Sequence, residues 1–249
     1  MENIDINEKS YISWDYLCPI INSNLNLNYS SAGTHGQHKG LSVNGKLPYS
    51  ISEYEFNYVK SFIIKHNLTS GFDLSTGTGI SALAMGFGMK ETNGSILSVD
   101  SYVEFEKSKY IQHNSEGYGS FESESFTNNK NLIRLFGLEK YVDLRVGVSP
   151  HDCKYFLSER PKLDVVFFDC PKTEADFHRD VPYIKEKLNE ERFAIFWHDT
   201  HAFMDDFKRL SVEYFDVESV QLYDFEFDGN TFKQHFPLSV ITNIKDFNK

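Results

Sequence analysis

The stretch Gly71-Phe72-Asp73-Leu74-Ser75-Thr76-Gly77-Thr78-Gly79-Ile80-Ser81-Ala82 decides the fold of this chain. Its apolar start predicts a short buried strand, its glycines predict a turn, and the residues that follow predict a helix to about Lys90. Gly77 and Gly79 let the backbone turn tightly and let a ligand approach where a Cβ would block it. The free N–H groups at the start of the helix point toward that ligand. Strand, turn and helix together are therefore typical of a nucleotide or cofactor cradle.

Two acidic residues bear on which cofactor the cradle holds. The glycine spacing also fits the dinucleotide fingerprint GxGxxA, so an NAD-dependent dehydrogenase stays an alternative, as does a packing turn without a ligand. Asp73 lies at the strand end, where a nicotinamide fingerprint needs no acid and where it could face the ammonium group of S-adenosylmethionine (SAM). Asp100 ends the next predicted strand, where a carboxylate can accept hydrogen bonds from ribose hydroxyls. These acids favour SAM. The cofactor-site residues expected from the cradle and this strand are Asp73, Ser75, Gly77, Gly79, Ser81 and Asp100.

The composition fits one α/β domain and argues against two kinds of partner. With 249 residues and 40% hydrophobic residues, the chain can bury a full core. The formal net charge of −11 argues against a general nucleic-acid or anionic-membrane surface. No apolar run approaches the roughly 20 residues of a membrane span, and the first residues do not form a signal peptide. Three scattered cysteines without a CxxC spacing indicate a reducing compartment. We therefore expect a cytoplasmic protein, and a homodimer is compatible with the sequence.

Strand and helix patterns alternate along the rest of the chain. Strands are predicted at 95–100, 141–146, 163–168 and 193–197, and helices at 52–66, 128–136, from 149, 173–188 and 203–210. Two β-rich runs, 214–223 and 236–242, have no helix between them and should pair antiparallel. The sequence therefore predicts the α/β class: a doubly wound, mostly parallel, seven-stranded Rossmann-like sheet with a C-terminal antiparallel hairpin.

The chain divides into an N-terminal segment and a cofactor-binding domain. Residues 1–50 are the least regular and are interpreted as a cap or substrate segment, with a polar, glycine-punctuated loop at 30–40. Residues 51–249 form the SAM-binding domain, and the capping box Ser52-Glu-Tyr-Glu55 begins its first helix. The stretch 101–127 is longer than a usual connection and is interpreted as an insertion, a candidate lid.

Several acidic and polar residues end or follow predicted strands. Ligands of doubly wound sheets bind outside the carboxyl ends of the strands, so we expect these side chains to gather along one rim. The set is Asp73, Asp100, Ser149, Asp169 and Asp199.

The cradle and these acids resemble those of class I SAM-dependent methyltransferases. Over about residues 50–243 the chain is similar to the metal-dependent O-methyltransferases of the catechol and caffeoyl-CoA type and to their bacterial relatives acting on sugars and secondary metabolites. Those families carry acid–hydrophobic–Gly–x–x–x–Gly–x–Ser, and the stretch 73–81 keeps the acid, the last glycine and the serine. It departs at Ser75, where the families prefer glycine. The resemblance implies that the Ile51 backbone and Ser81 hold the methionyl carboxylate of SAM, Asp100 the ribose and Ser149 the adenine.

The resemblance also implies a metal site and a catalytic base. Asp169-Cys-Pro-Lys172 matches the Asp-x-x-Lys of the catechol-type enzymes, and His198-Asp199-Thr200 lies where these families carry Asp-Asn, Glu-Asp or His-Asp. By this resemblance Asp169, Asp199 and Thr200 bind Mg²⁺ or another divalent metal, and Asp169 also borders the cofactor. Lys172 is the implied base, with His198 or His201 as alternatives.

The implied reaction is O-methylation of a small-molecule hydroxyl acceptor. The metal lowers the pKa of the hydroxyl, and a lysine next to a dication can be depressed enough to take its proton. The oxygen then attacks the SAM methyl in line. Two other hypotheses stay open: a metal-independent methyltransferase acting on nitrogen or RNA, and a SAM- or nucleotide-binding protein without catalysis. The acids could also merely cap the helices that follow them.

Overall fold

The computed structural model describes residues 10–35, 38–43, 51–102, 124–169, 173–198, 204–215, 221–222, 226–227, 230–231 and 238–245. Within them, five strands run parallel: β3 (Ser70–Leu74), β4 (Ser95–Asp100), β5 (Val142–Val146), β6 (Val165–Phe168) and β7 (Ala194–Trp197). Strand β11 (Ser239–Thr242) pairs antiparallel with β7 and with β8 (Gln221–Leu222). The order of the described seven-stranded sheet is β5-β4-β3-β6-β7-β11-β8. The predicted doubly wound sheet with its antiparallel C-terminal pair is confirmed.

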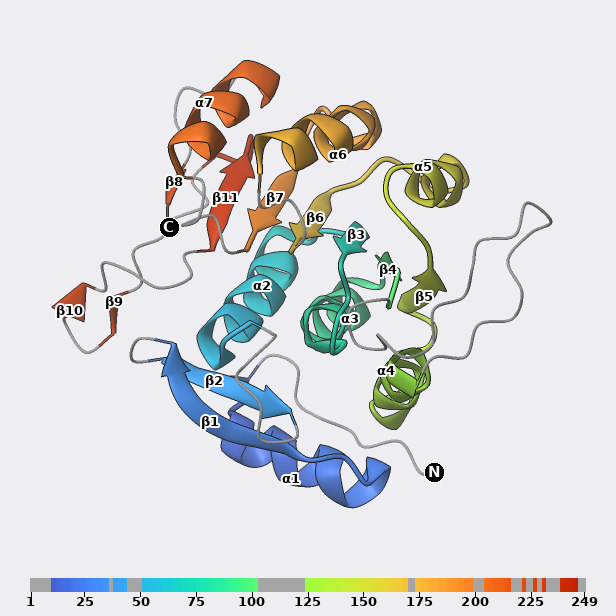
Figure 1. Ribbon diagram of the computed structural model, residues 1–249, viewed down its shortest axis with the longest axis vertical. Coiled ribbons are helices and arrows are strands. Elements are labelled where there is room, and N and C mark those ends of the chain that lie inside the picture. Colours follow the sequence, from blue (N-terminus) through green and yellow to red (C-terminus); the bar gives the residue numbers. More distant parts are fainter. Residues whose placement is uncertain are drawn as a thin grey trace.

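Helices cover both faces of this sheet (Figure 1). One face carries α2 (Glu53–His66), α3 (Ile80–Thr92) and α4 (Glu124–Leu135), and the other carries α5 (His151–Ser158), α6 (Glu174–Lys187) and α7 (Met204–Phe215). Side chains alternate between the faces along each strand. On β3, Phe72 and Leu74 pack with the α5–α7 helices, so Asp73 between them faces the α2–α4 side.

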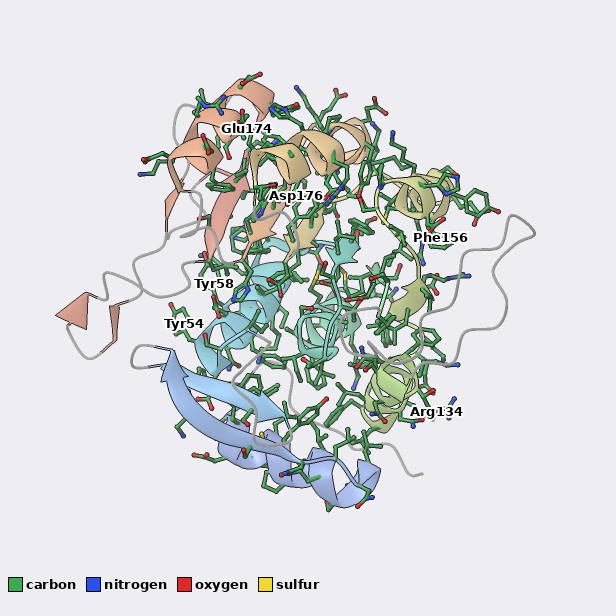
Figure 2. The ribbon with its side chains drawn as sticks, in the orientation of Figure 1. Tyr54, Tyr58, Arg134, Phe156, Glu174 and Asp176 are labelled. Atoms are coloured by element: carbon green, nitrogen blue, oxygen red, sulfur yellow. The ribbon has the colours of Figure 1, made fainter. Side chains whose placement is uncertain are left out.

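Helix α2 begins with the predicted capping box. The Glu55 backbone N–H donates to Ser52 Oγ (3.3 Å), and the Ser52 backbone N–H donates to Glu55 Oε2 (2.7 Å). Tyr54 and Tyr58 project from the same side of α2 (Figure 2), with ring centroids 6.2 Å apart. Tyr58 and Phe62 meet the ring of Phe196 edge-on, at 6.0 and 5.1 Å. These aromatic contacts hold α2 against β7.

The N-terminal segment forms a further layer outside α2–α4 (Figure 1). It consists of α1 (Trp14–Leu25) and an antiparallel hairpin of β1 (Tyr29–His35) and β2 (His38–Val43). The predicted loop at 30–40 is therefore wrong for the described residues, which lie in strands. Glycines and polar residues suggested a turn, whereas buried Tyr29 and Leu41 place this hairpin against the core. The Tyr29 hydroxyl also donates to the Thr78 carbonyl in the cradle (3.3 Å).

Three predicted boundaries are shifted. Helix α4 begins at Glu124, earlier than expected, and residues 103–123 of the predicted insertion lie outside the described residues. Helix α5 begins at His151 with Pro150 as N-cap, two residues later than the predicted start at 149. Helix α7 continues through Tyr214 and Phe215, which had been assigned to a strand, because their rings pack onto the core beneath α6 and α7. Element ends are the least determined by local sequence.

A small antiparallel pair consists of β9 (Glu226–Phe227) and β10 (Asn230–Thr231). None of the helices in the described ranges has the length and apolar character needed to cross a membrane.

Candidate functional site

The carboxyl ends of β4, β3, β6 and β7 lie level at one rim of the sheet. The Ser75 N–H donates to the Val99 carbonyl (2.9 Å), the Asp169 N–H to the Leu74 carbonyl (3.2 Å), and the His198 N–H to the Phe168 carbonyl (2.9 Å). Parallel pairing thus continues past the strand ends and fixes the first residues of each loop. The chain reverses its direction of strand addition between β3 and β6, so the rim includes the switch point where doubly wound sheets bind ligands.

Three residues of the cradle have left-handed backbone conformations. The φ angles are +76° at Ser75, +51° at Gly77 and +83° at Gly79. Glycine adopts such angles without steric cost, whereas an L side chain is strained there. The structure therefore explains why glycine suits position 75, and it shows that the serine present here still allows the turn to form. Helix α3 starts directly after Gly79, with its free N–H groups toward the turn.

Asn129 of α4 holds the cradle from outside. Its amide Nδ2 donates to the Gly77 carbonyl (2.9 Å) and to the Tyr102 hydroxyl (3.3 Å), and its side chain is buried. A Cβ at position 79 would lie 2.7 Å from Asn129 Oδ1, so glycine is needed there for space as well as for conformation. The sequence analysis did not identify Asn129. The available signal was a polar residue on the helix face that also carries Leu132, Ile133 and Phe136.

Asp73 lies buried beneath the cradle. Its Oδ2 accepts hydrogen bonds from Ser98 (2.6 Å) and Ser81 (3.2 Å), while its Oδ1 has no hydrogen-bond partner among the described residues. Burial raises the pKa of Asp73 to about 7; the two serine hydroxyls oppose that rise, and the charges of Asp169 and Asp100 add to it. A buried carboxyl group that has a free oxygen, and on which no cation of the described residues acts, is suited to receive a cationic ligand.

Asp100 ends β4 and Ser149 follows β5, so both lie on the side of β3 opposite to β6. Asp100 accepts hydrogen bonds from the backbone N–H groups of Gly77 (2.7 Å) and Tyr102 (2.5 Å), which ties the cradle to the end of β4. The Ser149 hydroxyl donates to Asp180 and lies 2.8 Å from the Tyr183 hydroxyl, on the α6 side. Ile51 is buried immediately before the α2 cap. The cofactor roles predicted for these residues stay predictions.

His198 lies between two carboxylates. Its Nδ1 is 2.9 Å from Asp169 Oδ1, and its Nε2 is 3.6 Å from Glu55 Oε1. Burial opposes a charged ring, but the attraction of Asp169 and Glu55 outweighs it and raises the pKa of His198 well above its ordinary value. Burial likewise disfavours ionised Glu55, yet His198 and the hydrogen bonds from Ser52 lower the pKa of Glu55 below its ordinary value. The three groups form a partly buried charge relay, called here the Glu55–His198–Asp169 relay.

Four predicted residues cannot be placed relative to this relay. Lys172, Asp199, Thr200 and His201 lie outside the described residues. Among the described residues, no three His, Cys, Asp or Glu side chains gather as a metal site. Asp169 is a suitable oxygen ligand at the rim, and its Oδ1 faces His198. Asp169 can therefore serve as one ligand of the predicted metal site, while the ligand roles of Asp199 and Thr200 stay predictions.

Three solved structures share the fold at low identity. An O-methyltransferase from Bacillus cereus, solved with S-adenosylhomocysteine (SAH), has 10% identity and a TM-score of 0.53, covering 77% of this chain and 82% of that chain. TomG, an O-methyltransferase of Streptomyces achromogenes involved in tomaymycin synthesis and solved with SAM, has 11% identity and a TM-score of 0.53, with coverages of 77% and 80%. The SAH-bound methyltransferase PaMTH1 of Podospora anserina has 12% identity and a TM-score of 0.51, with coverages of 79% and 80%. At such identities these likenesses concern the fold.

Sequence comparison identifies the family. No curated protein matches the chain. The sequence model of a family described as "Methyltransferase domain" matches residues 74–200, just over half of the chain. The matched residues begin at the last residue of β3 and so include the turn and helix of the cradle, Asp100, Asp169 and His198. The chain therefore belongs to this methyltransferase family and is a class I SAM-dependent methyltransferase.

Proposed function

We propose that this methyltransferase transfers the methyl group of SAM to a hydroxyl group of a small molecule, assisted by a divalent metal. The observation that carries the proposal is the gathering of Asp73, Asp100 and Asp169 around the switch point, with His198 beside them. The O-methyltransferases from Bacillus cereus and Streptomyces achromogenes, which share the fold, support the hydroxyl as acceptor.

The cofactor half of the site would bind SAM through charge and backbone contacts. Asp73 would receive the ammonium group, because its Oδ1 is buried without a hydrogen-bond partner among the described residues. Ser81 and the Ile51 backbone would hold the methionyl carboxylate near the start of α3, and Asp100 the ribose. Ser149 would border the adenine, although its hydroxyl is already engaged by Asp180 and Tyr183, so its contact would be through the backbone.

The acceptor half would lie between Asp169 and the residues after β7. Asp169, Asp199 and Thr200 are the proposed metal ligands, and the bound metal would supply polarisation of the acceptor hydroxyl. Lys172 or His201 would take the hydroxyl proton. His198 is less suited to that role, because its Nδ1 lies at hydrogen-bond distance from Asp169 and its Nε2 faces the buried Glu55 carboxylate. The acceptor oxygen then bonds to the methyl carbon as the methyl–sulfur bond breaks, leaving SAH.

The proposal is tested with radiolabelled SAM and a panel of hydroxyl acceptors that begins with catechol. We expect label transfer that falls at least tenfold in EDTA and returns on addition of Mg²⁺. Transfer undiminished by EDTA would favour the metal-independent alternative. SAM binding by calorimetry without transfer to any hydroxyl acceptor would favour a protein that binds SAM without this reaction.

A further inference from the structure

Glu55 uses only one of its carboxylate oxygens in the helix cap. Oε2 accepts the hydrogen bond from the Ser52 backbone N–H, and the side chain is 3% exposed. Oε1 has no hydrogen bond of good geometry to any described residue and lies 3.6 Å from His198 Nε2. A capping box works with glutamine as well as glutamate, so the cap does not require a charge at this position. A buried charge is costly unless an opposite charge faces it, and the group that faces Glu55 is His198.

His198 connects Glu55 to Asp169 at the rim of the sheet. Its ring is 8% exposed and its other nitrogen, Nδ1, is 2.9 Å from Asp169 Oδ1. The ring also lies beside that of Phe167, with centroids 6.3 Å apart and the two planes inclined by 29°. Asp169 is the outermost member of the relay, with a side chain 22% exposed. The relay therefore runs from a buried helix start to a carboxylate at the mouth of the site.

The elements that carry the relay are rigidly connected. The backbone of His198 continues the β6–β7 ladder, and Asp169 continues the β6–β3 ladder. Glu55 lies in the first turn of α2, which the rings of Tyr58 and Phe62 fix to Phe196 of β7. Groups on such a scaffold keep one geometry, which is what precise orientation of a reacting group requires.

We propose that Glu55 is a positioning residue of the methyl-transfer site: acting through His198, it holds the Asp169 carboxylate in the orientation used at the acceptor side. The proposal rests on the proposed function, since it assigns Asp169 to the reaction centre. Glu55 lies outside the stretch matched by the family, on an element that precedes the cradle. A positioning role of Glu55 would extend the acceptor half of the site to α2.

The test uses two variants that separate the cap from the relay. Glu55→Gln keeps an oxygen for the Ser52 N–H and removes the charge facing His198. Ser52→Ala removes the hydroxyl that caps α2 and leaves the Glu55 carboxylate in place. For Glu55→Gln we expect kcat for methyl transfer to catechol to fall about 10- to 100-fold, with KM for SAM unchanged within twofold. For Ser52→Ala we expect a lower melting temperature and kcat unchanged within twofold.

A second readout does not depend on turnover. In protein labelled with ¹⁵N-histidine, the Nε2–H signal of His198, identified by its absence in the His198→Gln/Glu55→Gln double variant, should be protected from exchange in wild type and Ser52→Ala. It should be lost or shifted in Glu55→Gln.

Two results would overturn the proposal: a kcat for Glu55→Gln within twofold of wild type, or equal losses of kcat in both variants, which would leave Glu55 as a cap only. If wild type transfers no methyl group to hydroxyl acceptors, the proposed function fails, and the nitrogen signal alone decides. An unchanged signal in Glu55→Gln would then overturn the relay.

Discussion

The buried carboxylates of Asp73 and Glu55, in the two halves of the rim, have different charged surroundings. On the cofactor side, the Asp73 carboxyl group accepts hydrogen bonds from two serine hydroxyls, and its pKa is raised to about 7 chiefly by burial. On the acceptor side, Glu55 is equally buried, but the chain supplies its own cation, His198, and the pKa of Glu55 is lowered. We therefore propose that a cationic ligand balances the charge of Asp73, whereas His198 of the protein itself balances that of Glu55. This difference predicts opposite responses to neutralising substitutions.

The largest effect is expected from His198→Gln. Removing the ring leaves buried Glu55 without its opposite charge, which should lower the free energy of unfolding by about 3 kcal/mol. The measurement is denaturant unfolding at pH 7. Adding Glu55→Gln in the same chain should restore most of the loss, because no buried charge then remains. A stability equal to wild type in the single variant would show that the relay contributes nothing.

Asp73→Asn should leave folding stability intact and weaken ligand binding instead. It removes a buried charge that no cation among the described residues balances, so the melting temperature should stay unchanged or rise. Binding of SAH should weaken by about 2 kcal/mol, or roughly 30-fold, because a charge-assisted contact to the ammonium group is lost. Isothermal titration calorimetry and thermal unfolding measure the two effects. Unchanged SAH affinity would remove Asp73 from the cofactor site.

The cofactor half should also respond to pH. Below about pH 7 the Asp73 carboxyl group holds a proton in the free protein, and binding of an ammonium group requires the ionised form. SAH affinity should therefore fall roughly tenfold as the pH is lowered from 7.5 to 6. The range stays below about 8, where the amino group of the ligand itself titrates. In Asp73→Asn this pH dependence should disappear; if it persists, another group causes it.

A smaller effect is expected where the cradle is held by a neutral side chain. Asn129→Ala removes the hydrogen bond to the Gly77 carbonyl, so SAH should bind about 1 kcal/mol, or roughly fivefold, more weakly. Asn128→Ala is the matched control, since it makes the same change one position earlier on α4, and its SAH affinity should equal that of wild type. Equal affinities in both variants would mean that the Gly77 contact does not shape the site.

The smallest effect concerns the backbone of the cradle. Ser75→Gly relieves a left-handed conformation that costs a side chain about 1 kcal/mol, but glycine also makes the unfolded chain more flexible. We expect a net gain of about 0.5 kcal/mol in the free energy of unfolding, measured by denaturant unfolding, and no gain in Ser75→Ala. A loss of stability in Ser75→Gly would show that the serine side chain contributes a contact.

Local patterns predicted most of the fold. The cradle, the capping box at Ser52 and the apolar strand before Asp169 follow from residue spacing alone, because hydrogen bonding and burial within one element repeat with its period. The hairpin at β1 and β2 was missed, since its polar, glycine-containing sequence differs little from a loop, and antiparallel pairing with a partner strand determines it. Tyr214 and Phe215 were misassigned because packing overrode their β propensity.

The sequence by itself determined that acids lie at or just after the ends of several strands of a doubly wound sheet, and hence that Asp73, Asp100 and Asp169 share one rim. Only the tertiary structure decided what each acid meets there. Glu55 appeared as a cap, and nothing local indicates that its second oxygen faces a histidine after β7; Asn129 gave no indication that it reaches Gly77. The reason is physical: the period of an element fixes which face a side chain lies on, whereas its partner across a helix–strand contact depends on how separate elements pack.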